Sequence, residues 1–109
     1  MNPGNIYVVV PCYNEIQVIS DTIKNLLPYN YNIIVVNDGS NQNIKAAISD
    51  LPIIYAEHKI NLGQGAALRT GSDLAMKKGA EVIVHFDSDG QHLASDIAAM
   101  IEPLRENKV

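Results

Sequence analysis

Four short apolar runs constrain the fold more than any other feature of the chain. They cover residues 6–10, 33–36, 53–56 and 82–86. Each run is of strand length, is rich in β-branched residues and is apolar at successive positions, which is typical of parallel strands covered on both faces. Because segments with helical periodicity separate the runs, the sequence predicts a βα repeat.

Polar residues and glycines mark the expected helices. Asn14 is a candidate N-cap, with Gln17 three residues later, and the helical spacing that follows ends at Pro28. Further helices are expected over residues 43–49, from 64 to a stop at 79, and over 97–104. Crossovers between parallel strands are right-handed. We therefore predict a doubly wound, mostly parallel Rossmann-like α/β sheet with helices on both faces and ligands at the carboxyl ends of its strands.

Size and charge limit the possible functions. The 109 residues suffice for one compact domain, and 47% hydrophobic against 18% charged residues indicates a folded chain. A formal charge of -4 argues against nucleic acid or an anionic membrane as a general partner, because both attract a basic face. The single Cys12 cannot form an internal disulfide, and no apolar run could span a membrane, so a cytosolic location is the default expectation.

Polar turns follow the first two runs. Tyr13 and Glu15 place an aromatic ring and a carboxylate at the mouth of the sheet, where they can contact a nucleotide base and ribose. The alternative is an ordinary helix start, with Glu15 beside the helix dipole. Asp38 lies in an Asp-Gly turn, a common signal by itself. At the end of a second strand, however, an acidic residue can accept hydrogen bonds from a ribose or a base.

The later turns offer anion and metal chemistry. Gly63 and Gly65 open a helix whose unpaired N–H groups can bind an anion, with Arg69 one turn further on. Close helix–sheet packing and a solvated arginine explain these residues equally well. Asp87 and Asp89 lie two positions apart and can converge on Mg²⁺ or Mn²⁺ carrying a diphosphate, although such a pair also occurs in surface turns.

Two other metal sites are disfavoured. A calcium-binding EF-hand loop starting at Asp87 would need glycine and glutamate where His92 and Ala98 stand. A zinc site from His58, His85 and His92 lacks a coherent ligand spacing, and lone histidines are more often structural.

Four segments, residues 11–15, 37–40, 61–71 and 87–92, carry the polar residues described above. In this order and at these strand ends, they resemble family 2 glycosyltransferases of the GT-A fold. Residues 87–92 are similar in particular to the dolichyl-phosphate and other polyprenyl-phosphate mannose or glucose synthases. Asn37 stands where many relatives have aspartate. The candidate nucleotide-sugar site comprises Pro11, Tyr13, Glu15, Asp38, Gly63, Arg69, Asp87 and Asp89, and the candidate metal ligands are Asp87, Asp89 and Gln91.

The resemblance implies inverting transfer of a hexose from a UDP- or GDP-sugar, with the metal neutralising the departing nucleoside diphosphate. A polyprenyl phosphate acceptor at a membrane surface is already an anion and needs no general base, unlike a sugar hydroxyl. The acceptor site and any catalytic base are expected beyond Val109. We therefore expect residues 1–109 to be the nucleotide-sugar-binding part of a longer domain, inactive alone and able to self-associate through residues 82–86.

Rival functions differ in where their motifs lie. A sugar nucleotidyltransferase would carry a Gly-rich, Arg-containing loop after the first strand, where this chain has residues 11–15. A phosphatase would place its aspartate pair after the first strand instead of the fourth. A non-catalytic nucleotide-sugar-binding module stays open, because the sequence fixes neither the base nor the sugar.

Overall fold

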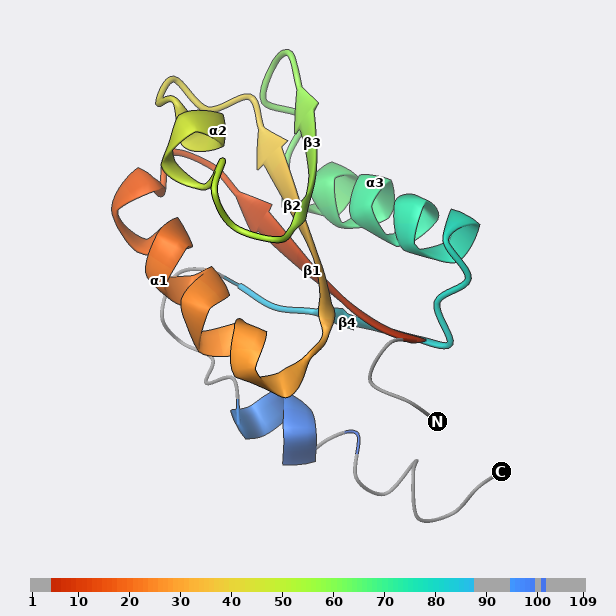
Figure 1. Ribbon diagram of the computed structural model, residues 1–109. Helices are drawn as coiled ribbons and strands as arrows, with labels where there is room; N and C mark the ends of the chain where they lie inside the picture. The colour runs from red at the N-terminus through yellow and green to blue at the C-terminus, as the bar shows by residue number, and fades with distance from the viewer. Residues whose placement is uncertain (1–4, 88–94, 100, 102–109) are drawn as a thin grey trace.

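The computed structural model describes residues 5–87, 95–99 and 101. Strands and helices alternate along these residues, as expected (Figure 1). The elements are β1 (Ile6–Cys12), α1 (Ile16–Leu26), η2 (Leu27–Tyr29), β2 (Asn32–Asp38), α2 (Ile44–Ala47), β3 (Ile54–His58), α3 (Gln64–Lys77) and β4 (Val82–His85). Residues 95–99 and 101 are also helical. Each predicted apolar run therefore forms a strand.

The described strands form one parallel sheet in the order β3-β2-β1-β4. Val8 on β1 lies opposite Ile33 on β2 and opposite Val84 on β4. From β1 the chain adds β2 and then β3 on one side, and it then crosses back to add β4 on the other side of β1. Parallel α/β sheets bind ligands beyond the carboxyl ends of their strands at such a reversal. The predicted Rossmann-like fold is confirmed.

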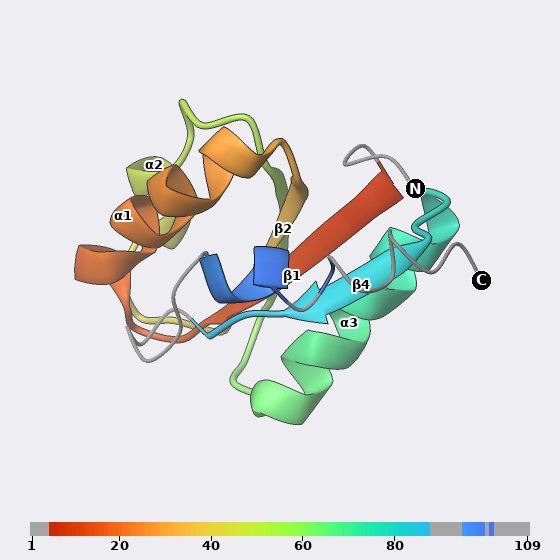
Figure 2. The ribbon, with the colours of Figure 1, turned by 90° about the horizontal axis from the view of Figure 1, so that it is seen from below.

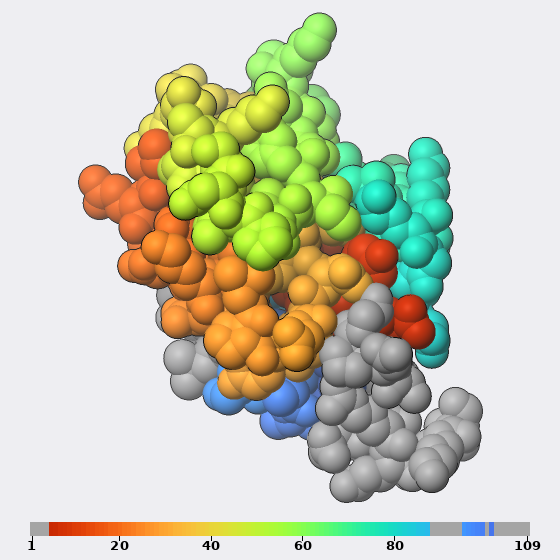
Figure 3. All heavy atoms as spheres, in the orientation of Figure 1, coloured from red at the N-terminus to blue at the C-terminus, as the bar shows by residue number. Residues whose placement is uncertain are grey.

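Helices cover both faces of the sheet. Figure 2 shows α1 and α2 on one face of the sheet and α3 on the other. In Figure 3, side chains of α1 and α2 cover the face on which these two helices lie. Alternate residues of each strand therefore enter different cores. The core under α1 and α2 includes Val8, Val10, Ile19, Ile23, Ile33, Val35, Ile97 and Ile101. The core under α3 includes Tyr7, Val9, Ile34, Val36, Ala67 and Ala75.

Gly71 allows α3 to approach the sheet closely. A Cβ added at Gly71 would lie 2.3 Å from Cγ1 of Val9 and 3.2 Å from Cγ2 of Val36. A side chain there would therefore push the helix away from β1 and β2. The packing explanation accounts for this glycine.

The start of α1 differs from the predicted cap. Asn14 has a left-handed backbone with φ of 53°, and Glu15 is the residue before the helix. The Asn14 side chain accepts a hydrogen bond from the backbone N–H of Asn41 at 2.8 Å. The side chain of Gln42 instead accepts from the backbone N–H of Ile16 at 3.0 Å. The prediction that Asn14 caps α1 is wrong, because the connection after β2 supplies the acceptor.

Within the described residues, β4 lies at one edge of the sheet. Self-association through this edge stays a prediction that light scattering can test. No helix in the described part of the chain is long and apolar enough to cross a membrane.

Candidate functional site

A pocket of about 350 Å³ opens at the carboxyl end of the sheet. Its wall combines segments that follow all four strands, because the carboxyl ends of parallel strands meet at one edge. The lining residues are Pro11, Cys12, Tyr13, Glu15, Asp38, Asn61, Gly63, Gln64, Ala67 and Asp87.

Most of the candidate nucleotide-sugar residues that the structure describes lie in this wall. They are Pro11, Tyr13, Glu15, Asp38, Gly63 and Asp87. Arg69 is exposed on α3 and does not line the pocket, so the surface-charge interpretation fits it better. Asp89, Gln91 and His92 lie outside the described residues. Of the three candidate metal ligands, the structure therefore places Asp87.

Asp38 is a buried carboxylate, 2% exposed, at the end of β2. Its Oδ1 accepts hydrogen bonds from Nδ1 of His58 at 2.8 Å and from the backbone N–H of Leu62 at 2.9 Å. Its Oδ2 accepts from Nδ2 of Asn61 at 3.0 Å and from the backbone N–H of Gly63 at 2.9 Å. Because a carboxylate offers about four acceptor sites, these protein donors occupy all of them.

The hydrogen bonds also keep Asp38 ionised. Burial alone would raise the pKa of this carboxyl, but the hydrogen bond from His58 and those from the backbone of Leu62 and Gly63 outweigh burial and lower the pKa below its ordinary value. Asp38 is therefore an anion at neutral pH. It fastens the connection between β3 and α3 to the end of β2.

The turn after β2 touches the same connection. Gly39 has φ of 70°, in the left-handed region. A Cβ at Gly39 would lie 2.3 Å from the carbonyl carbon of Ile60 and 2.4 Å from the backbone nitrogen of Asn61. Since both are backbone atoms, neither can rotate aside. Glycine is required here for its conformation and for its missing side chain.

The loop that carries Tyr13 is fastened to the β2 turn as well. Ser40 Oγ accepts a hydrogen bond from the backbone N–H of Asn14 at 2.8 Å. The backbone N–H of Ser40 in turn donates to Oδ1 of Asn37 at 3.1 Å. The Tyr13 side chain, 46% exposed, remains free to present its ring at the pocket wall.

Asn37 uses both ends of its side-chain amide. While its Oδ1 accepts from Ser40, its Nδ2 donates to the hydroxyl of Tyr55 at 2.9 Å. That hydroxyl donates to Oε1 of Glu57 at 2.8 Å. A carboxylate at position 37 could not donate to Tyr55, which explains why an amide suits this position.

The other side of the pocket is the amino end of α3. Gly63 precedes the helix with φ of 104°, and no side chain caps the first turn. A Cβ at Gly63 or Gly65 would meet no atom within 4 Å, so these glycines leave open space at the helix start. Nε2 of Gln64 donates to Oδ1 of Asp87 at 2.7 Å and joins this end of α3 to the residues after β4. An uncapped helix start beside a pocket is an anion-binding arrangement.

Cys12 lines the pocket without being a reactive thiol. It is 1% exposed, and burial, opposed by a backbone hydrogen bond at Glu15, raises its pKa to about 11. The thiol is therefore protonated at neutral pH and is a poor nucleophile.

Zinc binding gains no support from the described residues. They contain no group of three or more His, Cys, Asp or Glu side chains placed to hold a metal ion. Nε2 of His85 lies 3.0 Å from Oγ of Ser72, whereas His58 belongs to the Asp38 network. Sequence reasoning missed the contribution of His58, Asn61 and Gln64 to this site.

Known proteins share the sequence pattern. Residues 7–109 match the family described as Glycosyl transferase family 2. The UDP-N-acetylglucosamine-dolichyl-phosphate N-acetylglucosaminyltransferase of Methanococcus voltae is 37% identical, over 91% of this chain and 47% of that protein. The polyprenol monophosphomannose synthase of Mycolicibacterium smegmatis is 29% identical, over 87% of this chain and 39% of that protein. The chain thus spans less than half the length of these relatives.

A solved structure shares the fold. Glucosyl-3-phosphoglycerate synthase from Mycobacterium tuberculosis, in complex with Mn²⁺, uridine diphosphate and glucosyl-3-phosphoglycerate, matches with a TM-score of 0.74. The match covers 93% of this chain and 39% of that chain at 22% identity, which speaks to the fold alone. The family match extends over nearly the whole sequence and includes each of the four strand ends. The chain therefore belongs to glycosyl transferase family 2.

Proposed function

We propose that the pocket binds the nucleotide-sugar donor of an inverting hexosyltransferase. One observation carries the proposal: an exposed aromatic ring, an uncapped helix start and a carboxylate converge on a single pocket of about 350 Å³. Tyr13, Gly63 and Asp87 mark these three features. They suit the base, the diphosphate and a divalent cation, and the volume lies in the range of about 300–1,000 Å³ that is usual for small-molecule sites.

Each wall has its own part in donor binding. Tyr13 stacks on the base, and Glu15 accepts hydrogen bonds from the ribose. The first turn of α3 faces the diphosphate with its unpaired N–H groups. Asp38 contributes less directly than the sequence indicates, because a ligand N–H can reach its carboxylate only by replacing one of four protein donors.

A divalent cation fits the donor chemistry of the three candidate metal ligands. Asp87, Asp89 and Gln91 all offer oxygen, which Mg²⁺ and Mn²⁺ prefer. Within the described residues, Asp87 uses Oδ1 for the hydrogen bond from Gln64, which leaves Oδ2 for a cation. When bound, the cation supplies neutralisation of the charge that builds on the departing nucleoside diphosphate. Gln64 would hold the Asp87 carboxylate in a fixed orientation.

We propose polyprenyl phosphate as the acceptor. The M. voltae and M. smegmatis relatives are named for dolichyl phosphate and for a polyprenol monophosphate product. A phosphate oxygen is anionic and can attack the anomeric carbon without a general base. In this proposal, residues 1–109 supply the donor site, and the acceptor site belongs to the part of the relatives that has no counterpart in this chain.

Calorimetric titration with UDP- and GDP-hexoses, with and without Mn²⁺, tests the donor site. We expect saturable binding of one nucleotide that Mn²⁺ strengthens. Tyr13→Ala should weaken binding about tenfold, since base–aromatic stacking contributes roughly 1–3 kcal/mol per base. Asp87→Asn should remove the Mn²⁺ dependence, whereas Asp73→Asn, an exposed aspartate on α3, should not. If neither UDP-hexoses nor GDP-hexoses bind, the proposal is refuted.

A further inference from the structure

We propose that His58 is a positioning residue of the donor pocket. It holds Asp38, and through Asp38 the connection formed by residues 61–63, without itself lining the pocket. The inference rests on the proposed function for the identity of the ligand, but the positioning itself can be tested without any ligand.

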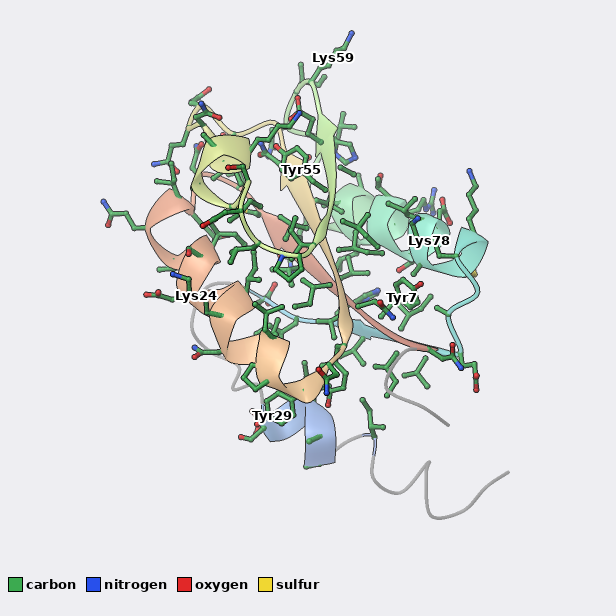
Figure 4. All side chains as sticks on the ribbon, in the orientation of Figure 1. Tyr7, Lys24, Tyr29, Tyr55, Lys59 and Lys78 are labelled. Atoms are coloured by element: carbon green, nitrogen blue, oxygen red, sulfur yellow. The ribbon has the colours of Figure 1, made fainter. Side chains whose placement is uncertain are left out.

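The His58 side chain, at the end of β3, lies between the Asp38 carboxylate and the Thr70 hydroxyl. His58 is the last residue of β3 and the direct partner of Asp38 in the β2–β3 ladder. Nδ1 lies 2.8 Å from Oδ1 of Asp38, and Nε2 lies 2.8 Å from Oγ1 of Thr70 on α3. The His58 side chain is 11% exposed. The next residue, Lys59, points away from the protein into solvent (Figure 4).

The proton arrangement on the ring follows from the charge of Asp38. An ionised carboxylate can only accept, so Nδ1 of His58 carries a hydrogen and donates it. Each ring nitrogen therefore has a partner, and the two partners lie on different elements. This arrangement fixes both the tautomer and the orientation of the ring.

The connection after β3 depends on these hydrogen bonds because its apolar side chains are mostly exposed. Ile60 is 65% exposed and Leu62 is 55% exposed. The backbone amides of Leu62 and Gly63 are held by the two oxygens of Asp38. If that carboxylate rotated, both amides would lose their acceptors together. His58 opposes the rotation, since it holds Oδ1 with a hydrogen bond of 2.8 Å.

Thr70 gives the ring a firm anchor. It precedes Gly71, where an added Cβ would collide with the side chains of Val9 and Val36. The ring is thus tied to a tightly packed part of the helix, whereas the connection it supports is exposed. Neither His58 nor Thr70 lines the pocket, so the two residues support Asp38 without contacting the ligand themselves.

Hydrogen exchange of backbone amides, followed by NMR without ligand, tests the positioning. His58→Leu removes both ring contacts, His58→Asn keeps a donor near Asp38, and Thr70→Val removes only the anchor. Ser72→Ala is the matched control, because it breaks a histidine hydrogen bond on the same helix that is unconnected to Asp38. Titration of each variant with UDP- and GDP-hexoses in the presence of Mn²⁺ provides the second measurement.

We expect His58→Leu to speed hydrogen exchange at the amides of Leu62 and Gly63 at least about tenfold, which is the effect of losing a hydrogen bond to a charged group. The core amides of β1 should exchange at the same rate in His58→Leu as in the control Ser72→Ala. Donor binding should weaken by about the same factor, and His58→Asn should restore most of both. Unchanged exchange at the two amides, or equal acceleration throughout the core, would overturn the proposal.

The remaining outcomes are also decisive. If His58→Leu fails to fold, Thr70→Val decides: local acceleration beyond Ser72→Ala supports the role, and its absence contradicts it. If the wild-type chain binds neither nucleotide class, the proposed function fails, yet the exchange measurement still tests His58.

Discussion

Substitution of Gly39 by alanine is expected to dislodge the pocket wall at residues 60–63. The added Cβ would lie 2.3 Å from the carbonyl carbon and 2.7 Å from the carbonyl oxygen of Ile60, and 2.4 Å from the nitrogen of Asn61. Ordinary van der Waals contact begins near 3.4 Å. The connection must therefore retreat by roughly 1 Å, which is enough to weaken hydrogen bonds to Asp38.

The expected destabilisation has two parts. Alanine at a φ of 70° loses roughly 1–2 kcal/mol in the left-handed region, and overpacking against backbone adds about 1–3 kcal/mol. Gly79→Ala isolates the first part, because Gly79, just after α3, has φ of 89° but a Cβ there meets no atom within 4 Å. Gly65→Ala should show neither part, and should be neutral or slightly stabilising at the start of α3.

Urea denaturation of the three variants gives the comparison, with nucleotide-sugar titration as the functional measurement. We expect Gly39→Ala to lose about 2–5 kcal/mol, Gly79→Ala about half as much and Gly65→Ala nothing. Gly39→Ala should also bind donor more weakly than its stability loss alone explains. A Gly39→Ala variant as stable as Gly79→Ala would contradict this expectation, because the clash with the backbone would then have no energetic consequence.

Three further results are expected. The folded-state pKa of Asp38 lies below its ordinary value of 3.8, so its contribution to stability is complete above that value and is lost as the pH falls through the folded pKa. Acid denaturation curves of wild type and Asp38→Asn should therefore converge at low pH. Cys12, with a pKa of about 11, should resist alkylation at pH 8 unless the chain is unfolded, as mass spectrometry can show. Asn37→Asp should lower the free energy of unfolding by about 1–3 kcal/mol, because Tyr55 loses its donor; a neutral effect in urea would contradict this.

The strands were predictable, but their ends were not. Apolar runs located each strand within about two residues, since burial on both faces requires them. Polar residues at the carboxyl ends still pair in the ladder, as Cys12 does with Asn37 and Asp38 does with His58. The strands thus extend into the site, because backbone pairing does not depend on apolar side chains.

The site was predictable where it follows from topology. Tyr13, Asp38 and Asp87 share a pocket because parallel strands end at one edge. The donors to Asp38 could not be found in the same way. His58 and Asn61 lie 20 and 23 residues further along the chain, and no periodicity relates them to Asp38. The same holds for Asn14, whose side chain serves another connection instead of its own helix.

In the proposed donor site, one pocket holds both the nucleotide and the cation. NMR mapping tests it most directly, with chemical shifts measured on adding UDP- or GDP-hexose with Mg²⁺, and line broadening measured on replacing Mg²⁺ with Mn²⁺. We predict shifts at Tyr13 and Gly63 and broadening centred on Gln64 and Asp87. Broadening remote from Asp87, or shifts confined to the smaller hollow of about 180 Å³ beside Tyr55, would contradict the account.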